Sequence, residues 1–133
     1  MNAGRLARLR QHLTVGAASP FVWGRCDCSL WPCDWIAGEV RIDPAAHLRG
    51  TYHDALSCAR LLKREGGLPA LAASLAVTAG LARTADPVPG DVGVIETRIG
   101  AFLMLNCSGS GWAWKTRDGV LFGSAAPLMA WSV

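Results

Sequence analysis

The first half of the chain has apolar residues at helical spacing, and its opening segment shows the pattern most simply. Leucines recur at i, i+3 and i+7, which predicts a first helix that ends in the Gly16–Pro20 segment. These leucines are Leu6, Leu9 and Leu13. Asp27 can cap a second helix that runs to about Gly38. In that register Pro32 falls at the fifth helical position, where its ring disturbs the first turn.

Two further helices are predicted before the pattern changes. Thr51 and Asp54 resemble a capping box, and the apolar stripe behind them is stopped by Gly66-Gly67. That stripe consists of Tyr52, Ala55, Leu56, Ala59 and Leu62. Pro69 suits the first turn of a fourth helix, which closes near Gly80. Its apolar face consists of Leu68, Leu71, Ala72 and Leu75.

The second half of the chain changes to short β-type segments after residues 87–91. The expected strands are Val92–Thr97, Ala101–Cys107, Gly111–Thr116, Val120–Phe122 and Leu128–Val133. Arg117-Asp118-Gly119 is a strong hairpin-turn signal between two of them. Helices followed by a meander of strands predict an α+β fold, with N-terminal helices packed on a C-terminal antiparallel β-sheet. We expect one domain over 1–133, mainly helical in 1–80 and mainly β in 87–133.

Composition narrows the class of protein. The chain has 133 residues, of which 51% are hydrophobic and 17% charged, and such a chain buries a core instead of staying disordered. The net charge of +3 is not gathered into a basic stripe, so no nucleic-acid partner is expected. No apolar run reaches the ~18 residues of a membrane-spanning helix, and no secretory signal is recognised. We therefore expect synthesis in the cytoplasm, without a membrane span.

The cysteines supply the candidate chemistry. Their odd count favours free thiols over a disulfide framework. They are Cys26, Cys28, Cys33, Cys58 and Cys107. One interpretation is a metal-binding module that uses Cys26, Cys28, Cys33 and Cys58, with His53 as a further ligand, although the cluster lacks the C-x2-C spacing of a zinc knuckle. A second is that Cys33 and Cys58 are buried as small apolar side chains.

A third interpretation makes Cys28 a nucleophile at the start of the second helix. A helix N-terminus lowers the pKa of a thiol, and the backbone N–H groups there can hold an oxyanion. A histidine on the adjacent sheet would be the base. This chemistry needs no cofactor, and we expect none.

Two segments resemble the NlpC-type cell-wall peptidases, a compact papain-like family. Phe21-Val22-Trp23-Gly24 followed by Asp27-Cys28-Ser29-Leu30 is similar to that family's W-G…D-C-S-G-L segment, and Pro89-Gly90-Asp91-Val92 is similar to its P-G-D-L turn. The resemblance implies a papain-like fold in which Cys28 is the nucleophile that cleaves peptidoglycan stem peptides. It further implies that Asp27 orients or caps the site and that the N–H groups of Cys28 and Ser29 face the oxyanion.

The resemblance is closer to a branch of this family carried by phages, prophages and gene transfer agents among their tail genes, and it extends over nearly the whole chain. It implies a virion protein of the tail or tail tip whose partners are other tail or baseplate proteins, with peptidoglycan as a further partner. The shared positions are Trp23-Gly24, Asp27-Cys28, Asp34-Trp35, Asp43-Pro44-Ala45-Ala46, Arg49-Gly50-x-Tyr52, Gly66-Gly67-Leu68, Gly90-Asp91-Val92, Gly119 and Trp131.

The family's catalytic histidine has no counterpart in this sequence. It opens the strand after the P-G-D-L turn, and the corresponding stretch here, 99–105, contains no histidine. All three histidines, His12, His47 and His53, lie upstream, and we expect His53 on the half-exposed polar face of the third helix. The family's glycine after Ser29 is also replaced, by Leu30. Only Asp27 or His53 is left to substitute for the base.

We therefore expect a tail-tip or tail-assembly component with a peptidase-like fold and a degraded catalytic site. Trp112 and Trp114, in phase on one strand face, are the expected interface residues, whereas Trp31 and Trp35 at helical spacing are expected in the core. One alternative is an active cysteine peptidase that uses Cys28 during DNA entry. The other is the cysteine-cluster metal module.

Overall fold

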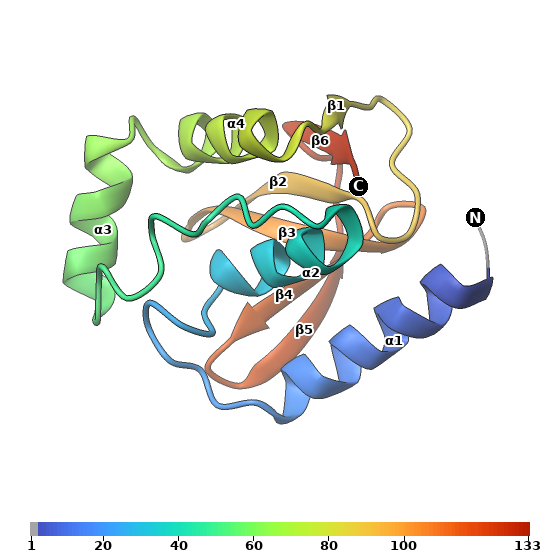
Figure 1. Ribbon diagram of the computed structural model, residues 1–133, viewed down its shortest axis with the longest axis horizontal. Coiled ribbons are helices and arrows are strands. Elements are labelled where there is room, and N and C mark those ends of the chain that lie inside the picture. The colour runs from blue at the N-terminus through green and yellow to red at the C-terminus, as the bar shows by residue number, and fades with distance from the viewer. Residues whose placement is uncertain (1–2) are drawn as a thin grey trace.

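The computed structural model describes residues 3–133, which form helices on one side of an antiparallel sheet (Figure 1). The helices are α1 (Ala3–Ala18), α2 (Leu30–Val40), α3 (Ala55–Arg64) and α4 (Leu68–Ala79). The strands are β1 (Ala82–Arg83), β2 (Val92–Thr97), β3 (Gly100–Ser108), β4 (Gly111–Thr116), β5 (Gly119–Ser124) and β6 (Met129–Ser132). The predicted α+β class is confirmed. Within 3–133 no helix is long and apolar enough to cross a membrane.

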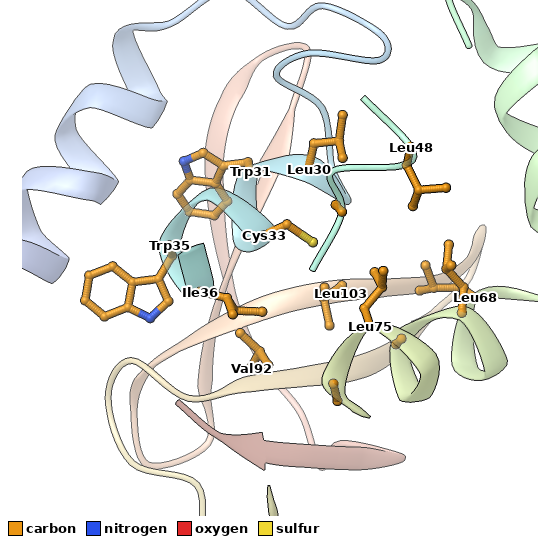
Figure 2. Packing of buried hydrophobic residues seen from close by; sticks show 14 of the residues in the cluster. Leu30, Trp31, Cys33, Trp35, Ile36, Leu48, Leu68, Leu75, Val92 and Leu103 are labelled. Atoms are coloured by element: carbon orange, nitrogen blue, oxygen red, sulfur yellow. The ribbon is translucent and has the colours of Figure 1, made fainter. Parts of the chain in front are cut away.

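The sheet has the order β1-β6-β2-β3-β4-β5, and every neighbouring pair is antiparallel. Its main core lies between the sheet and the helices. Figure 2 shows Cys33 and Ile36 of α2 and Leu75 of α4 pointing toward Val92 and Leu103 on the sheet. A smaller apolar cluster covers the outer face, because successive side chains of a strand alternate between its faces. This outer cluster consists of Ile95, Met104, Trp112 and Ala130.

The helix α2 begins later than its sequence suggests. Asp27 does not stand directly before it. Instead, the Asp27 carboxylate accepts hydrogen bonds from the N–H groups of Ser29 and Leu30, at 3.1 and 2.9 Å. Leu30 is the first helical residue, so Pro32 lies in the first turn, where its missing N–H leaves no intrahelical bond unmade. The predicted conflict at Pro32 therefore disappears.

The predicted start of α3 is wrong. Its N-cap is Asp54, which accepts a bond from the N–H of Ser57 at 2.7 Å and forms a capping box with that residue. The Thr51 hydroxyl donates back to the Leu48 carbonyl instead, at 2.7 Å. The predicted stripe faces the core only in part: Tyr52 is buried and Leu62 packs against the core, whereas Ala55 and Ala59 are exposed. Leu56 is 59% exposed, whereas Cys58 and Leu61 are buried.

The other elements follow their predicted ranges closely, except β1, which was not predicted. One buried lysine joins α1 to the sheet. The ranges of β2 and β4 are those predicted, and Gly80 ends α4 in the left-handed conformation. Lys115 on β4 is buried, and its Nζ donates to the carbonyls of Gly16 and Ser19 at 2.7 and 2.6 Å. A positive charge at this position complements the carbonyl end of α1.

The packing of α1 on α2 allows a direct test of the fold. A Cβ on Gly16 would lie 2.3 Å from Nε1 of the buried Trp31. We expect Gly16→Ala to lower the free energy of unfolding by about 1–3 kcal/mol, because neither the ring nor the helix has room to move. The measurement is chemical denaturation followed by tryptophan fluorescence.

Gly38 of α2 is the matched control, because no atom lies within 4 Å of a Cβ placed there. We expect Gly38→Ala to raise stability by about 0.5–1 kcal/mol through the lost backbone freedom of the unfolded chain. Equal effects at the two glycines would contradict the described contact between α1 and α2.

Candidate functional site

The carboxylate of Asp27 is the organising group of the candidate site. Asp27 is fully buried, at 0% exposure, in the turn that precedes α2. One oxygen accepts from the N–H groups of Ser29 and Leu30, and the other from the N–H of Gly24 at 2.9 Å and the hydroxyl of Tyr52 at 2.5 Å. Both oxygens are thus engaged by donors, so this carboxylate holds the loop in place and has no direct contact with which to take a proton from Cys28.

The segment before α2 is fixed to the segment before α3 at Gly24. The residue has a φ of 79°, and a Cβ there would lie 2.2 Å from the carbonyl oxygen of Tyr52. The N–H of Gly50 donates to the Gly24 carbonyl at 2.9 Å. Only glycine allows this approach of two backbones. The Trp23-Gly24 and Gly50-x-Tyr52 positions therefore hold together the two segments that surround Asp27. We call these segments and their bonds to Asp27 the frame around Asp27.

Other positions that carry the family resemblance also make structural contacts. Arg49 pairs with Asp43 at 2.8 Å and with Asp34 of α2 at 2.8 Å, so it fixes the connector to the helix. Its hydrogen bonds hold the pKa of Asp43 below the ordinary value. The indole N–H of Trp35 donates to the Gly90 carbonyl at 2.7 Å and links α2 to the turn before β2.

A second buried carboxylate, Asp91, lies directly before β2. It accepts from the N–H groups of Val88 and Val133 at 2.9 and 3.1 Å, and from the guanidinium of Arg5 at 3.3 Å. The same guanidinium also donates to the carbonyl of Val133. Asp91 therefore ties the start of β2 to α1 and to the last residue of the chain.

Cys28 lies beside a groove of about 380 Å³ between the loop before α2 and the β4–β5 hairpin. The residue as a whole is half-buried. The walls are largely aromatic, and the aromatic lining residues are Phe21, Trp23, Phe102 and Trp114. The arrangement brings a cysteine to a concave surface, as the nucleophile hypothesis requires.

The electrostatic environment of this thiol is the opposite of the one predicted. Burial, and then the negative charge of Asp27, raise the pKa of Cys28 to about 12. The expected lowering by a helix N-terminus is outweighed, because Cys28 lies two residues before α2 and its nearest full charge is negative. At neutral pH the thiol is protonated.

One of the two predicted oxyanion donors is already hydrogen-bonded within the protein. The N–H of Ser29 donates to Asp27 at 3.1 Å, so it is directed into the frame and not toward the groove. Asp27, Cys28 and Ser29 are therefore adjacent, as the sequence requires, and the N–H of Ser29 is bonded to Asp27. The Ser29 side chain does hydrogen-bond the Cys28 thiol, which lowers the thiol pKa, but burial and the charge of Asp27 outweigh this effect.

None of the chain's histidines lines the groove beside Cys28. His12 stacks on Trp31 with ring centroids 4.8 Å apart, and burial lowers its pKa. His47 is exposed in the connector after α2. His53 was predicted on the polar face of α3, but it lies before the helix begins. Its exposed ring faces Asp54, with His53 Nε2 3.5 Å from Asp54 Oδ2. At the start of β3, where the resembled family has its histidine, Ala101 packs toward the core.

The two tryptophans predicted at an interface share the outer face of the sheet, but only one is accessible. Trp112 is 1% exposed, and its N–H donates to the Ala125 carbonyl at 3.1 Å, so it does not serve as an exposed interface residue. Trp114 is half-buried and lines the groove beside Cys28 as well as a second groove of about 330 Å³ on the outer face. Trp31 and Trp35 are buried in the core, as predicted.

The cysteine-cluster hypothesis gains no support. Over residues 3–133, no three side chains of His, Cys, Asp or Glu lie together as metal ligands would. Cys33 and Cys58 are buried among apolar residues of the core, which confirms the prediction that they pack as small apolar side chains. Cys26, Cys28, Cys33 and Cys58 therefore do not form a metal centre.

The fold and the site together define an α+β domain with a protonated cysteine beside an aromatic groove. Over residues 3–133 the chain matches a family model described as Domain of unknown function (DUF6950), and it belongs to that family. No curated protein and no solved structure matches the chain.

The frame around Asp27 can be tested by substitution. We expect Asp27→Ala to lower the free energy of unfolding by about 3 kcal/mol or more, because it leaves several buried N–H groups without an acceptor. Tyr52→Phe should cost about 1.5–3 kcal/mol, since it removes one bond to a charged acceptor. Asp54→Ala, which removes an exposed capping carboxylate, is the control and should cost less than either. Thermal and urea unfolding give the comparison, and an Asp27→Ala chain as stable as Asp54→Ala would contradict the assigned role of Asp27.

The state of the Cys28 thiol predicts slow alkylation. With the pKa raised to about 12, about one thiol in ten thousand is ionised at pH 8. We expect iodoacetamide to modify Cys28 far more slowly in the folded chain than in urea, as followed by mass spectrometry of its peptide. A rate in the folded chain that levels off near neutral pH would show an activated thiolate instead.

Proposed function

We propose that the protein is a tail-tip or tail-assembly component of a tailed phage or a gene transfer agent. In this proposal it has the papain-like fold of the NlpC-type peptidases, but its cysteine site no longer hydrolyses. The observation that carries the second part is the surroundings of Cys28. The thiol pKa is raised to about 12, and no histidine lines its groove. A cysteine peptidase needs both an ionised thiol and a base.

The residues that carry the family resemblance support retention of the fold without its chemistry. Asp27 and Tyr52 hold the loop before α2, and Arg49 fixes the connector to that helix. Asp91 ties β2 to the C-terminal end of the chain. These interactions stabilise the architecture whether or not a substrate is cleaved, so selection for an assembly part would keep them.

The character of the groove also favours a protein partner over a cell-wall fragment. Its walls are mostly aromatic and aliphatic, with Ile99 and Leu121 beside the aromatic residues. Three charged residues also line it: Arg117 and Asp118 are exposed, and Lys115 is buried with its Nζ bonded to the carbonyls of Gly16 and Ser19. An apolar centre with charged groups at the rim is typical of contacts between protein chains.

One observation favours the alternative of an active peptidase, namely that Cys28 does line a groove of suitable size. In that case the reaction would cleave a stem peptide locally while DNA enters the cell. The two functions make different demands on the thiol. An assembly component tolerates its loss, whereas a peptidase does not.

The test uses particles produced by the host that encodes the chain. We expect proteomic mass spectrometry to find the chain in purified particles, and deletion of its gene to yield particles that lack complete tails in electron micrographs. Complementation with Cys28→Ala should restore tails and DNA delivery to the wild-type level, because the thiol carries no reaction in this account.

Two outcomes would contradict the proposal. If purified particles lack the chain, the tail assignment fails. If Cys28→Ala restores tails but not DNA delivery, the chain acts as a peptidase. Cys33→Ala is the matched control for removal of a thiol, since Cys33 is buried in the core away from the groove.

A further inference from the structure

The strand β5 forms one edge of the sheet and lacks the features that usually protect such an edge. It contains no charged residue and no proline, and its register with β4 is continuous. Edge strands of soluble proteins carry charges, prolines or bulges, which prevent pairing with another chain. Leu121 is 46% exposed and Phe122 is 65% exposed, and the strand stays exposed to Ser124. The C-terminal end of α1 passes close to Gly119, at the start of β5, and beyond that residue the edge is open to a further strand.

The main chain of β5 offers unpaired ladder groups at alternate residues. The pairing of β4 with β5 continues beyond the strand, where the N–H of Ala125 donates to the Ser110 carbonyl at 3.1 Å. Hydrogen-bonded pairs alternate along an antiparallel ladder, so Val120, Phe122 and Ser124 direct their N–H and C=O groups away from β4. Within 3–133, no hydrogen bond from a loop or a helix reaches these groups.

We propose that a second copy of this chain pairs with β5, antiparallel and about a two-fold axis at Phe122. In this register Phe122 exchanges both main-chain bonds with its counterpart, and Val120 does so with Ser124 of the second copy. The same surface serves both copies, so the contact closes as a symmetric dimer with one continuous sheet.

Side-chain sizes on the two faces fit this register. On the outer face, Leu121 lies opposite Gly123 of the second copy, and no atom lies within 4 Å of a Cβ placed on Gly123. The large Leu121 side chain of each copy therefore lies over the open space at Gly123 of the other copy. On the other face the exposed Phe122 rings meet across the axis, and aromatic pairs stabilise neighbouring strands.

The charges around β5 do not oppose the pairing. Lys115 of β4 lies opposite Val120, but it is buried and its Nζ is bonded to the carbonyls of Gly16 and Ser19. The exposed charged residues next to β5 in sequence are Arg117 and Asp118, in the turn before the strand. In the proposed register they lie next to the uncharged Ala125-Ala126 segment of the second copy, so no like charges face each other. This self-complementarity in size, charge and ladder groups favours a second copy over an unrelated extended segment. It also places the outer-face grooves of both copies on one side of the joined sheet.

The test measures the mass of the purified full chain by sedimentation equilibrium, from micromolar to near-millimolar concentration. We expect a reversible dimer of the 14.1 kDa chain. Phe122→Glu places two carboxylates across the axis and should raise the dissociation constant about tenfold or more. Val77→Glu adds the same charge at an apolar position of α4 that is 80% exposed, and it should leave the dimer unchanged.

Amide hydrogen exchange locates the contact within the chain. The N–H of Phe122 should become protected as the concentration rises, while the ladder between β2 and β3 keeps its protection. Circular dichroism confirms that each variant folds. A wild-type chain that stays monomeric throughout, a dimer that survives Phe122→Glu, or a dimer with an unprotected Phe122 amide would each overturn the proposal.

Discussion

The structure around the candidate site depends on one buried carboxylate. Asp27 gathers the N–H groups of Gly24, Ser29 and Leu30 and the hydroxyl of Tyr52, and so it fixes where α2 begins and where the segment before α3 passes. A buried carboxylate is tolerated only when donors surround it. The same requirement shapes the chemistry, because the donors that stabilise Asp27 include the N–H that an oxyanion would need, and its charge opposes ionisation of Cys28.

The contacts that stabilise this part of the fold do not depend on whether a reaction takes place at Cys28. Asp27, Arg49 and Asp91 stabilise junctions between elements, and each makes its contacts without reference to a substrate. The thiol of Cys28 belongs to the same loop but takes part in none of these junctions. Loss of a base on β3 would therefore leave the fold intact, and the aromatic groove beside Cys28 would remain as a surface for binding.

The sequence was a good guide wherever one periodicity acted alone. Short β-type segments predicted β2 and β4 with their observed bounds, and α4 follows its apolar face from Pro69 to Gly80. It failed where local signals compete, since both Thr51 and Asp54 are good capping residues and only the bond from Thr51 to Leu48 shows which one begins the helix. A two-residue strand such as β1 is too short for any pattern to show.

The candidate site was harder to predict, because its properties come from neighbours in space. Sequence order places Asp27, Cys28 and Ser29 together, but it does not show that the N–H of Ser29 is already bonded or that burial raises the Cys28 pKa. Likewise the alternation of β4 put Trp112 and Trp114 on one face, while the covering of Trp112 by Ala125 depends on the path of a distant loop.

We propose above that the Cys28 site belongs to a peptidase-like fold that no longer hydrolyses. The most direct test is mass spectrometry of peptidoglycan fragments incubated with the folded chain, beside a Cys28→Ser chain, over several wall types and pH values. This account predicts identical fragment patterns from the two chains. New stem-peptide cleavage by the wild-type chain that is lost in Cys28→Ser would contradict it and would require a base that reaches the thiol from elsewhere.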